Sequence, residues 1–399
     1  MQSFSQSPTD PAFVNDPYPF YDRVRAAGPL FYWSDYNIIC ASSYPAVDSL
    51  LRDRRLGREA PDPQPVPEHL RPFMAFERNS MLEREPPVHT RLRGLVVRAF
   101  TSRRIAAMGP EIAALSHQLI DRFPDQPFDL LPAFAEQIPV IVIARLLGVP
   151  EEMAPQLLAW SHDMVAIYQA NRDRAIEDRT VKATEDFSAF MRDYIEARRK
   201  TPKDDLLTHL IAAEEAGAKL STDELIATAI LLLNAGHEAT VHALGNGVHA
   251  LLASGLASGA LTGADRIAAT AEEILRFDPP LHMFTRYVYE DMALFGHDFK
   301  RGDQVALLLA AANRDPETYF QPNRFDPSRP VKANTSFGAG LHFCIGAPLA
   351  RLEMVTALPI LFERCPDLRL AAPARYADRY HFHGLDRLMV AAGRPNNAP

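Results

Sequence analysis

The stretch Phe337-Gly338-Ala339-Gly340-Leu341-His342-Phe343-Cys344-Ile345-Gly346 sets one cysteine among three glycines, and a helical pattern follows over residues 347–361. Glycine permits positive φ and lets the backbone approach a bound group closely. A cysteine at the start of a helix is stabilised as the thiolate by the helix dipole and by free N–H groups, and the thiolate is the metal-ligating form. Cys344 is therefore the candidate metal ligand of this chain.

The other two cysteines have an ordinary structural interpretation, and Cys344 itself has an alternative to metal binding. A lone cysteine is ordinarily a small buried hydrophobe, and we expect that role for Cys40 and Cys365. A nucleophilic pair of Cys344 with a histidine is a further option, although no third group that would orient the pair is evident.

The composition excludes several classes of protein. The chain has 399 residues and a net charge of −8, which argues against a nucleic-acid partner. Three widely spaced cysteines make no disulfide framework and fit a reducing compartment. Residues 1–20 are polar and rich in proline, unlike a signal peptide or a membrane span. We expect a cytoplasmic protein with no membrane and no nucleic-acid partner.

Most of the chain shows the three- and four-residue apolar spacing of helices, and no linker is evident, so we expect one domain over residues 1–399. The clearest helical segments are residues 129–147, 175–199, 204–216 and 264–277. Short strands are expected at residues 30–32, 37–41, 287–295 and 304–309, the last two around a turn at residues 300–302. Residues 58–71 are rich in proline and are expected to form a loop.

One long helix is expected from Ser221 to about Ser254. Ser221 and Glu224 have the spacing of a capping box, and no proline interrupts the segment. At 1.5 Å per residue the helix is roughly 50 Å long. Its middle is apolar nearly all round, which predicts burial, yet it includes His237 and Glu238, and buried polar groups need partners or a purpose.

The cysteine loop resembles that of the cytochrome P-450 family, F-x-x-G-x-H/R-x-C-x-G, and meets it at every defined position. The resemblance implies a mainly helical triangular fold with a small β region and a long central helix that crosses the haem. It implies haem b (iron protoporphyrin IX) ligated by Cys344, with further haem contacts from Phe337, Gly338, His342, Ile345 and Gly346. Thiolate ligation favours cleavage of the O–O bond. The implied reaction is insertion of one atom of O2 into a small-to-medium apolar substrate, with electrons from NAD(P)H through ferredoxin reductase and ferredoxin.

Three further motifs extend the resemblance. Glu273 and Arg276 match the family's E-x-x-R on a helix, and Arg324, in Pro322-Asn323-Arg324-Phe325, is the candidate third member of that group. The segment at residues 86–93 resembles P-P-x-H-T-R-L-R, which implies that His89 and Arg93 bind a haem propionate. Further propionate contacts are implied for Arg286 and His342, because propionates favour cationic partners.

The middle of the long helix, Ala235-Gly236-His237-Glu238-Ala239-Thr240, looks like the family's A-G-x-D/E-T-T. By this resemblance Ala235 and Gly236 lie against the haem, Gly236 leaves room for dioxygen, and Glu238 feeds protons. Ala239 departs from the family's threonine, whose hydroxyl assists proton delivery. Thr240 lies one residue on, rotated about 100° around the helix. Three explanations are open for the missing hydroxyl: ordered water replaces it, a polar group of the substrate replaces it, or the reaction is atypical, such as a peroxide-driven oxidation.

The family's pattern also places the substrate and the electron donor. The residues expected to line the substrate pocket are mostly apolar, as small-ligand sites are; they are Phe73, Met74, Met81, Leu82, Trp160, Val165, Tyr168, Leu232, Ala235, Ala239, Met283, Phe284 and Phe382. Three histidines could bind a polar group of the substrate, namely His282, His381 and His383. Basic contacts for an acidic ferredoxin are expected among Arg98, Arg103, Arg104 and Arg351.

Three alternatives remain open from the sequence. The same fold could support desaturation, oxidative coupling or peroxide-driven oxidation. It could also bind haem and a ligand without turnover. The third alternative is a cysteine hydrolase without haem.

Overall fold

The computed structural model describes residues 1–169, 172–215, 220–378, 380 and 382–393. It divides into two compact units, which we call unit 1 and unit 2. Unit 1 comprises Met1–Pro61, Ile112–Glu136 and Ala239–Pro399, and unit 2 comprises Asp62–Glu111 and Gln137–Glu238. The expectation of one domain over the whole chain stays a prediction.

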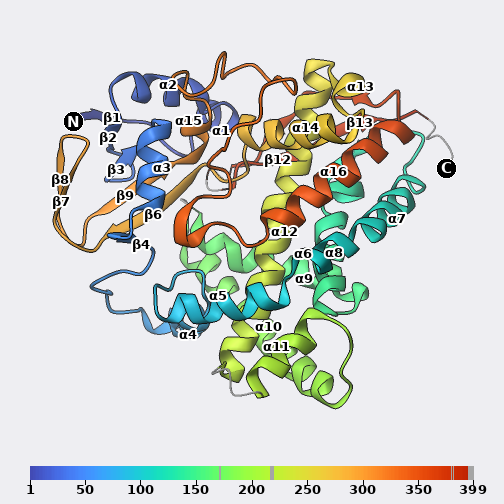
Figure 1. Cartoon of the computed structure of the whole chain (residues 1–399), viewed down its shortest axis with the longest axis horizontal. Helices are drawn as coiled ribbons and strands as arrows, with labels where there is room; N and C mark the ends of the chain where they lie inside the picture. The colour runs from blue at the N-terminus through green and yellow to red at the C-terminus, as the bar shows by residue number, and fades with distance from the viewer. Residues whose placement is uncertain (170–171, 216–219, 379, 381, 394–399) are drawn as a thin grey trace. The chain divides into compact units, whose positions relative to one another are not determined.

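The largest sheet belongs to unit 1 and has the strand order β1-β2-β3-β9-β6-β4. Its strands are β1 (Gln2–Phe4), β2 (Leu30–Trp33), β3 (Ile38–Ala41), β9 (Gln304–Leu308), β6 (Met283–Val288) and β4 (Leu56–Gly57). Strands β6 and β9 run antiparallel with Met283 opposite Leu308, and β3 runs parallel to β9 with Ile39 opposite Val305. Alternating apolar side chains of these strands enter two buried clusters, so the sheet forms the core beside helix α3 (Tyr44–Arg52; Figure 1).

Small sheets complete the β structure of unit 1. They are formed by β5 (Phe128–Asp129), β10 (Arg369–Leu370) and β13 (Met389–Ala391); by β11 (Arg375–Tyr376) and β12 (Leu385–Arg387); and by β7 (Met292–Leu294) and β8 (His297–Phe299). The helices of this unit are α1 (Pro11–Asn15), α2 (Tyr18–Ala26), α3, α13 (Ala257–Ala260), α14 (Ala264–Phe277), α15 (Leu309–Asn313), the short η5 (Gly340–His342) and α16 (Ala347–Arg364), with a π-helical turn η2 (Leu131–Ala135). Helices α14 and α16 pack side by side (Figure 1).

Unit 2 consists of helices and loops, with no strand among its described residues. Its elements are η1 (Glu68–Leu70), α4 (Arg71–Asn79), α5 (Val88–Ala99), α6 (Ser102–Ala107), α8 (Gln137–Leu147), η3 (Glu151–Met153), α9 (Ala154–Val165), η4 (Ala166–Tyr168), α10 (Arg174–Lys200) and α11 (Leu206–Glu215). Helix α7 (Gly109–Ile120) begins in unit 2 and continues in unit 1. Helix α10 packs against α9 and α4, and α11 packs against α5.

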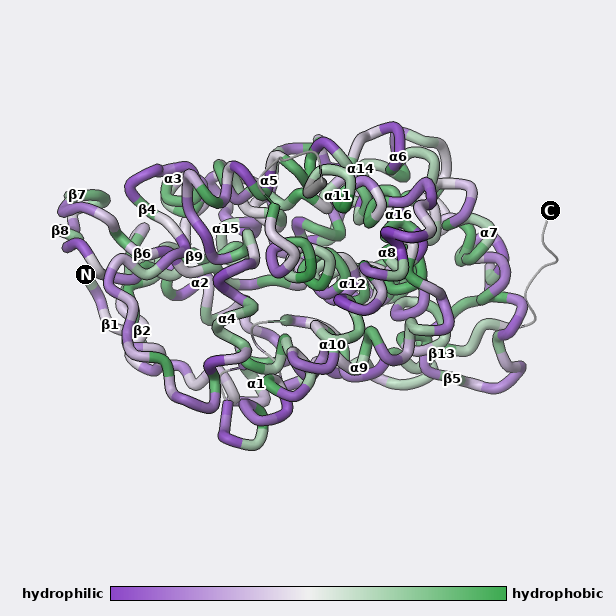
Figure 2. Tube along the Cα trace, turned by 90° about the horizontal axis from the view of Figure 1, so that it is seen from below, coloured by the Kyte–Doolittle hydropathy of each residue, from purple (hydrophilic) through white to green (hydrophobic). Residues whose placement is uncertain are grey.

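Helix α12 (Thr222–Ser254) contributes residues to both units. Its start is the predicted capping box: the Ser221 N–H donates to Glu224 Oε2 at 2.9 Å, and the Glu224 N–H donates to Ser221 Oγ at 3.2 Å. Residues Leu225–Leu233 are buried, and the helix is mostly apolar in Figure 2. Among the described residues, no helix has both the length and the apolarity that crossing a bilayer requires.

Most predicted elements are confirmed, and three are corrected. Residues 129–147 form the turn η2 and the separate helix α8 rather than one helix. The strand expected at residues 287–295 is β6, which ends at Val288, and the hairpin β7–β8 follows because Phe295 and Gly296 both adopt positive φ. The loop expected over residues 58–71 ends at residue 67, because η1 begins at Glu68 and α4 follows at Arg71.

Candidate functional site

The cysteine loop belongs to unit 1, and glycine conformations hold its shape. Gly338 and Gly340 have φ of 66° and 67°, a region that favours glycine. A Cβ on Gly340 would lie 2.6 Å from the carbonyl oxygen of Leu51, so the loop lies directly on the end of α3. The N–H of Cys344 donates to the carbonyl of Phe337 at 3.0 Å, which closes the loop around the cysteine.

Cys344 lies three residues before α16, and it differs from the other cysteines of the chain. It is exposed and in no disulfide, whereas Cys40 and Cys365 are buried. Burial raises the pKa of Cys365 to about 11, and it raises that of Cys40 further, so both stay neutral thiols. Only Cys344 combines exposure with the dipole and N–H groups of a helix start, the setting that stabilises a thiolate ligand.

A haem needs cationic groups for its propionates, and unit 1 supplies two candidates. Arg286 on β6 is 3% exposed, and its guanidinium donates to the carbonyl of Thr285 at 2.8 Å. The guanidinium also lies 5.8 Å from the ring centroid of Phe284. A buried guanidinium favours an anionic partner, so Arg286 fits a propionate. His342, half-buried in η5, is the second candidate.

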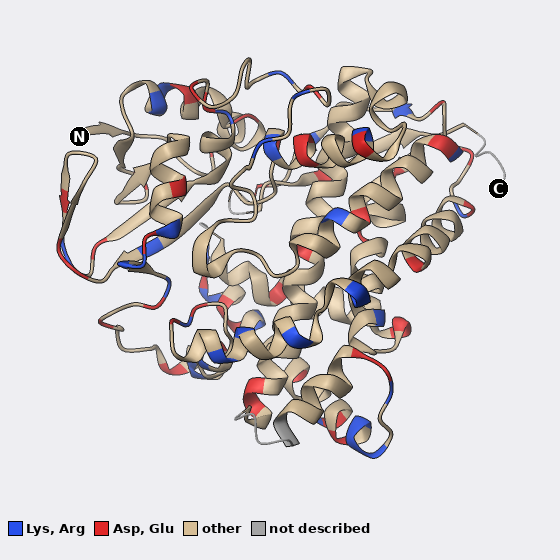
Figure 3. Cartoon of the chain, in the orientation of Figure 1, with Lys and Arg blue, Asp and Glu red and all other residues tan. Residues whose placement is uncertain are grey.

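Unit 2 supplies the other two propionate candidates on α5. His89 and Arg93 are four residues apart and therefore share one face of the helix. His89 is 2% exposed and Arg93 is half-buried. Figure 3 shows several basic residues along α5. The residues of each unit thus fit the group that the cysteine loop implies.

The middle of α12 interrupts the burial of the helix. Ala235 is exposed and Gly236 and Ala239 are half-buried, although the preceding residues 225–233 are buried. This opening suits a helix that borders a bound group. The reason expected for Gly236 needs correction, however, because a Cβ there would lie 2.8 Å from Cγ1 of Ile143. The missing side chain of Gly236 therefore makes room for helix α8.

The carboxylate of Glu238 lies among polar groups of unit 2. Its side chain is 7% exposed, and Oε1 accepts a hydrogen bond from Ser161 Oγ at 3.3 Å. The Nε2 atoms of His162 and His237 each lie 3.4 Å from the same oxygen. Sequence reasoning missed Ser161 and His162, because nothing in the local pattern of α9 indicates which residue of α12 it will face. Thr240 is 5% exposed.

The E-x-x-R pair forms a buried network in unit 1. Arg276 donates to both carboxylate oxygens of Glu273, at 2.7 and 2.8 Å, and also to the carbonyl of Asn313 at 2.9 Å. The expected third side chain, Arg324, is exposed, and only its carbonyl reaches Arg276, at 3.4 Å. The cation that pairs with Glu273 is Arg329, whose Nε lies 3.4 Å from Oε2. The assignment of Arg324 is therefore corrected to Arg329.

Two residues expected at the pocket wall make packing contacts within their own units. Trp160 stacks on Phe187 of α10 with ring centroids 4.9 Å apart. Met283 is 8% exposed and belongs to a core cluster of unit 1. These contacts belong to the packing of each unit, and the role of both residues at the pocket wall stays a prediction.

The remaining wall candidates are divided between the units. Unit 2 holds Phe73 and Met74 on α4, Met81 and Leu82 after it, Val165, Tyr168, Leu232 and Ala235; unit 1 holds Ala239, Phe284 and Phe382. Of the three histidines, His282 and His383 are buried with Asp278, and His381 lies outside the described residues. The carboxylate of Asp278 accepts hydrogen bonds from the hydroxyls of Tyr18 and Tyr376, so this cluster belongs to the buried core of unit 1.

The basic residues expected to contact an electron donor differ in their pairing. Arg98 and Arg103 are exposed, Arg104 pairs with Asp204 at 2.8 Å, and Arg351 pairs with Glu272. A hollow of about 440 Å³ lies beside the cysteine loop, lined by Arg52, Gly338, Gly340, Phe343 and Arg351 among others.

Comparisons with known proteins agree with this geometry. The model of the cytochrome P450 family matches residues 26–254 and 267–366. The polyketide biosynthesis cytochrome P450 PksS of Bacillus subtilis is 34% identical over 410 residues, which cover 99% of this chain and 100% of that protein. Vitamin D(3) 25-hydroxylase of Pseudonocardia autotrophica is 38% identical over 391 residues, covering 96% of this chain and 95% of that protein.

Solved structures show the same fold. The crystal structure of P450BioI in complex with an acyl carrier protein ligated to hexadec-9Z-enoic acid matches with a TM-score of 0.90 and 32% identity, over 96% of this chain and 100% of that chain. The crystal structure of Mycobacterium smegmatis CYP164A2 without ligand matches with a TM-score of 0.86 and 39% identity, over 96% and 98%. The predicted fold class is thereby confirmed. The chain belongs to the cytochrome P450 family, and it is a haem b oxidoreductase that incorporates oxygen from O2 into a small molecule.

Proposed function

We propose that this P450 inserts one oxygen atom of O2 into an apolar organic substrate of small to medium size. Electrons come from NAD(P)H through a ferredoxin reductase and a ferredoxin. The observation that carries the proposal is the exposed thiol of Cys344 in a glycine-held loop before α16. When bound there, haem b supplies the activation of dioxygen, which no side chain of the chain can perform.

The chain's own residues take three roles in this proposal. His89, Arg93, Arg286 and His342 hold the propionates through charge-assisted hydrogen bonds. Glu238 carries protons, because its carboxylate is nearly buried but lies 3.4 Å from the half-exposed imidazole of His162. The apolar wall candidates Phe73, Met81 and Leu232 favour a substrate with little polar surface, because burying an unpaired polar group is costly.

The first experiment is the spectrum of the reduced, carbon-monoxide-treated protein. We expect the red-shifted Soret band of thiolate-ligated haem, and we expect Cys344→Ser to lose it while far-UV circular dichroism stays unchanged. Cys365→Ser is the matched control, since that thiol is buried in the fold and its loss should leave the band in place. A histidine-type spectrum, or an unchanged spectrum in Cys344→Ser, would refute the proposal.

The second experiment addresses the substrate and the electron donor. A library of apolar compounds is screened for the shift of the ferric haem from low to high spin, and hits are tested with ferredoxin and its reductase. Product formation that requires O2 supports the proposal. A spectral shift without product under any electron supply would favour a ligand-binding protein instead.

Ala239 favours one second candidate, namely the same fold with atypical chemistry. The side chain at this position has no hydroxyl, so it cannot donate a hydrogen bond during proton delivery. Desaturation, oxidative coupling or peroxide-driven oxidation would then compete with hydroxylation. Product analysis with hydrogen peroxide in place of NAD(P)H and O2 separates the peroxide-driven reaction from the main proposal.

A further inference from the structure

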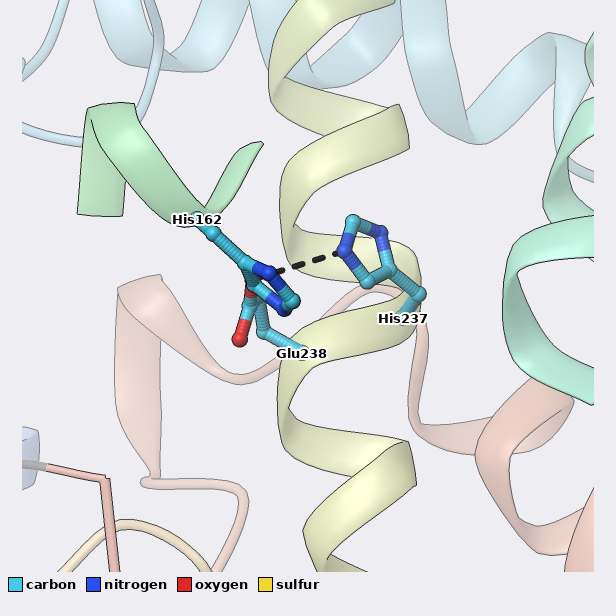
Figure 4. A group of neighbouring side chains, drawn as sticks. All are labelled: His162, His237 and Glu238. Atoms are coloured by element: carbon cyan, nitrogen blue, oxygen red, sulfur yellow. Dashed lines mark ion pairs between the residues drawn. The ribbon is translucent and has the colours of Figure 1, made fainter. Parts of the chain in front are cut away.

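Three potential metal ligands gather in unit 2 around the carboxylate of Glu238. His162 reaches it from α9, and His237 and Glu238 are neighbours on α12 (Figure 4). The Nε2 atoms of both histidines and the Glu238 carboxylate all lie within 4.8 Å of one another. Each of these side chains offers one atom that binds transition metals well.

The separations in this cluster suit a shared ion better than direct hydrogen bonds. Both histidine Nε2 atoms lie 3.4 Å from Glu238 Oε1. An N–H···O hydrogen bond is normally about 2.7–3.2 Å long. A tetrahedral ion with bonds of about 2.0–2.1 Å holds its ligand atoms about 3.3–3.4 Å apart, which is the observed distance of each histidine Nε2 from Oε1.

His237 is held in the form that a metal ligand requires. Its Nδ1 lies 2.7 Å from the carbonyl oxygen of Leu233, an acceptor only, so Nδ1 carries a proton and Nε2 is the ring nitrogen that can bind an ion. The side chain is 1% exposed, and Nε2 has no hydrogen-bond partner among the described residues. Metal-ligating histidines commonly donate their other N–H to a backbone carbonyl in this way.

His162 gives the cluster access to solvent. Its side chain is 49% exposed, so an ion can reach Glu238 from outside, and the ring can turn to close the third ligand separation. Two imidazoles and one carboxylate prefer zinc-like ions to magnesium or calcium, which favour oxygen ligands only. The fourth position of a tetrahedral ion would stay open to water, as in sites with three protein ligands.

We propose that His162, His237 and Glu238 form a binding site for one divalent, zinc-like ion. An ion bound there holds the carboxylate of Glu238, which can then no longer take up and release protons. Binding therefore slows turnover reversibly, and this consequence, unlike the binding itself, rests on the proposed function.

Isothermal titration of the haem-loaded protein with ZnCl2 tests the binding. We expect one ion per chain, and His162→Ala should weaken its affinity by more than about 100-fold, since even outer partners of a ligand change metal affinity 10–100-fold. The matched control is His209→Ala. Its imidazole is 48% exposed and lies 3.3 Å from Asp204, a similar setting with no third metal ligand among the described residues. Equal affinity in His162→Ala and the parent protein, or no stoichiometric binding, would overturn the site.

The inhibition is measured separately, on the holoenzyme with an established substrate. Zn2+ should lower product formation in the parent protein and in His209→Ala, and a chelator should restore it. The titration needs no turnover, so failure of the site and failure of the proposed function are distinguishable. Stoichiometric binding without any effect on turnover would refute the inhibitory role and keep the site.

Discussion

Under the proposed function, single residues decide how protons reach the reaction. Glu238 is nearly buried, and its carboxylate lies among the polar side chains of Ser161, His162 and His237. The next residue, Ala239, has no hydroxyl to continue the path. Whatever completes the path must therefore be a water, a substrate group or Thr240.

The change Ala239→Thr should raise the ratio of product formed to NADH consumed severalfold for a substrate without a polar group near the oxidised carbon. The added hydroxyl can donate and accept hydrogen bonds beside Glu238. NADH consumption, product and hydrogen peroxide are measured together. The companion Thr240→Ala tests the neighbouring hydroxyl. An unchanged ratio in Ala239→Thr would indicate that the wild-type path is already complete.

The burial of Glu353 on α16 predicts that the stability of the protein depends on pH. Its carboxyl is fully buried without a hydrogen-bond partner among the described residues, and burial raises its pKa well above the usual value. The folded state therefore binds a proton that the unfolded state releases. The stabilising contribution is present below the unfolded pKa and falls by about 1.4 kcal/mol per pH unit as the pH rises toward the folded pKa.

Glu353→Gln should remove this loss of stability as the pH rises above the usual range of a carboxyl pKa, because the amide does not titrate. Thermal unfolding of the holoprotein from acidic to neutral pH is the measurement. Glu363→Gln, at an exposed position on the same helix, should retain the parent's pH dependence. Parallel curves for the parent protein and Glu353→Gln would show that Glu353 does not carry the buried proton.

At the scale of elements, helix α14 is tied to the meander at residues 320–330 by one carboxylate. Glu273 binds Arg276 on its own helix, the N–H of Asp326 at 2.8 Å and the guanidinium of Arg329. Arg329 also donates to the carbonyl of Gln321 at 3.1 Å. This arrangement makes Arg329 the link between helix and meander.

Arg329→Ala should lower stability by about 2 kcal/mol, because it removes the second cation beside the buried carboxylate of Glu273 and the hydrogen bonds to the carbonyls of Gln321 and Arg324. Arg324→Ala, an exposed position in the same meander, should stay within about 0.5 kcal/mol of the parent. Thermal unfolding and haem retention are compared for the two variants. If Arg324→Ala lowered the stability as much as Arg329→Ala, Arg324 would also link the helix to the meander.

Gly340→Ala tests the loop around Cys344. The added methyl would meet the carbonyl oxygen of Leu51 at 2.6 Å, and φ of 67° is strained for alanine. We expect a loss of about 2 kcal/mol or more and a lower haem content per chain. Gly259→Ala is the control, since its added Cβ has nothing within 4 Å. Full haem content in Gly340→Ala would mean that the loop tolerates a shift.

At the scale of the whole molecule, charge constrains the binding of the proposed electron donor, a ferredoxin. The chain carries a net charge of −8, so an acidic ferredoxin is repelled except where basic residues gather. Arg98 and Arg103 are exposed, whereas Arg104 and Arg351 already pair with carboxylates. We therefore expect the first two to dominate the attraction.

The double variant Arg98→Glu with Arg103→Glu should slow reduction by ferredoxin about tenfold at low salt, with a smaller effect at high salt, because steering is screened. The control is Arg174→Glu with Arg179→Glu, which changes the net charge equally at exposed positions of unit 2. Stopped-flow reduction under carbon monoxide is the measurement. An equal loss in both variants would show that only net charge matters.

Elements with local causes were predictable from the sequence. The capping box begins α12 at Thr222, apolar periodicity places α14 at Ala264–Phe277, and the glycines around Cys344 form the expected loop. Each of these depends on residues within a few positions of one another, so the sequence contains the whole cause.

Long-range contacts were decided only by the tertiary structure. Gly236 faces Ile143, Glu273 pairs with Arg329, Met283 enters the core, and His162 reaches Glu238. In each case several residues of the right type were available, and the packing of helices and strands selected one of them. Periodicity determines which face of a helix is apolar, but the neighbour opposite that face follows from the path of the whole chain, which no local pattern encodes.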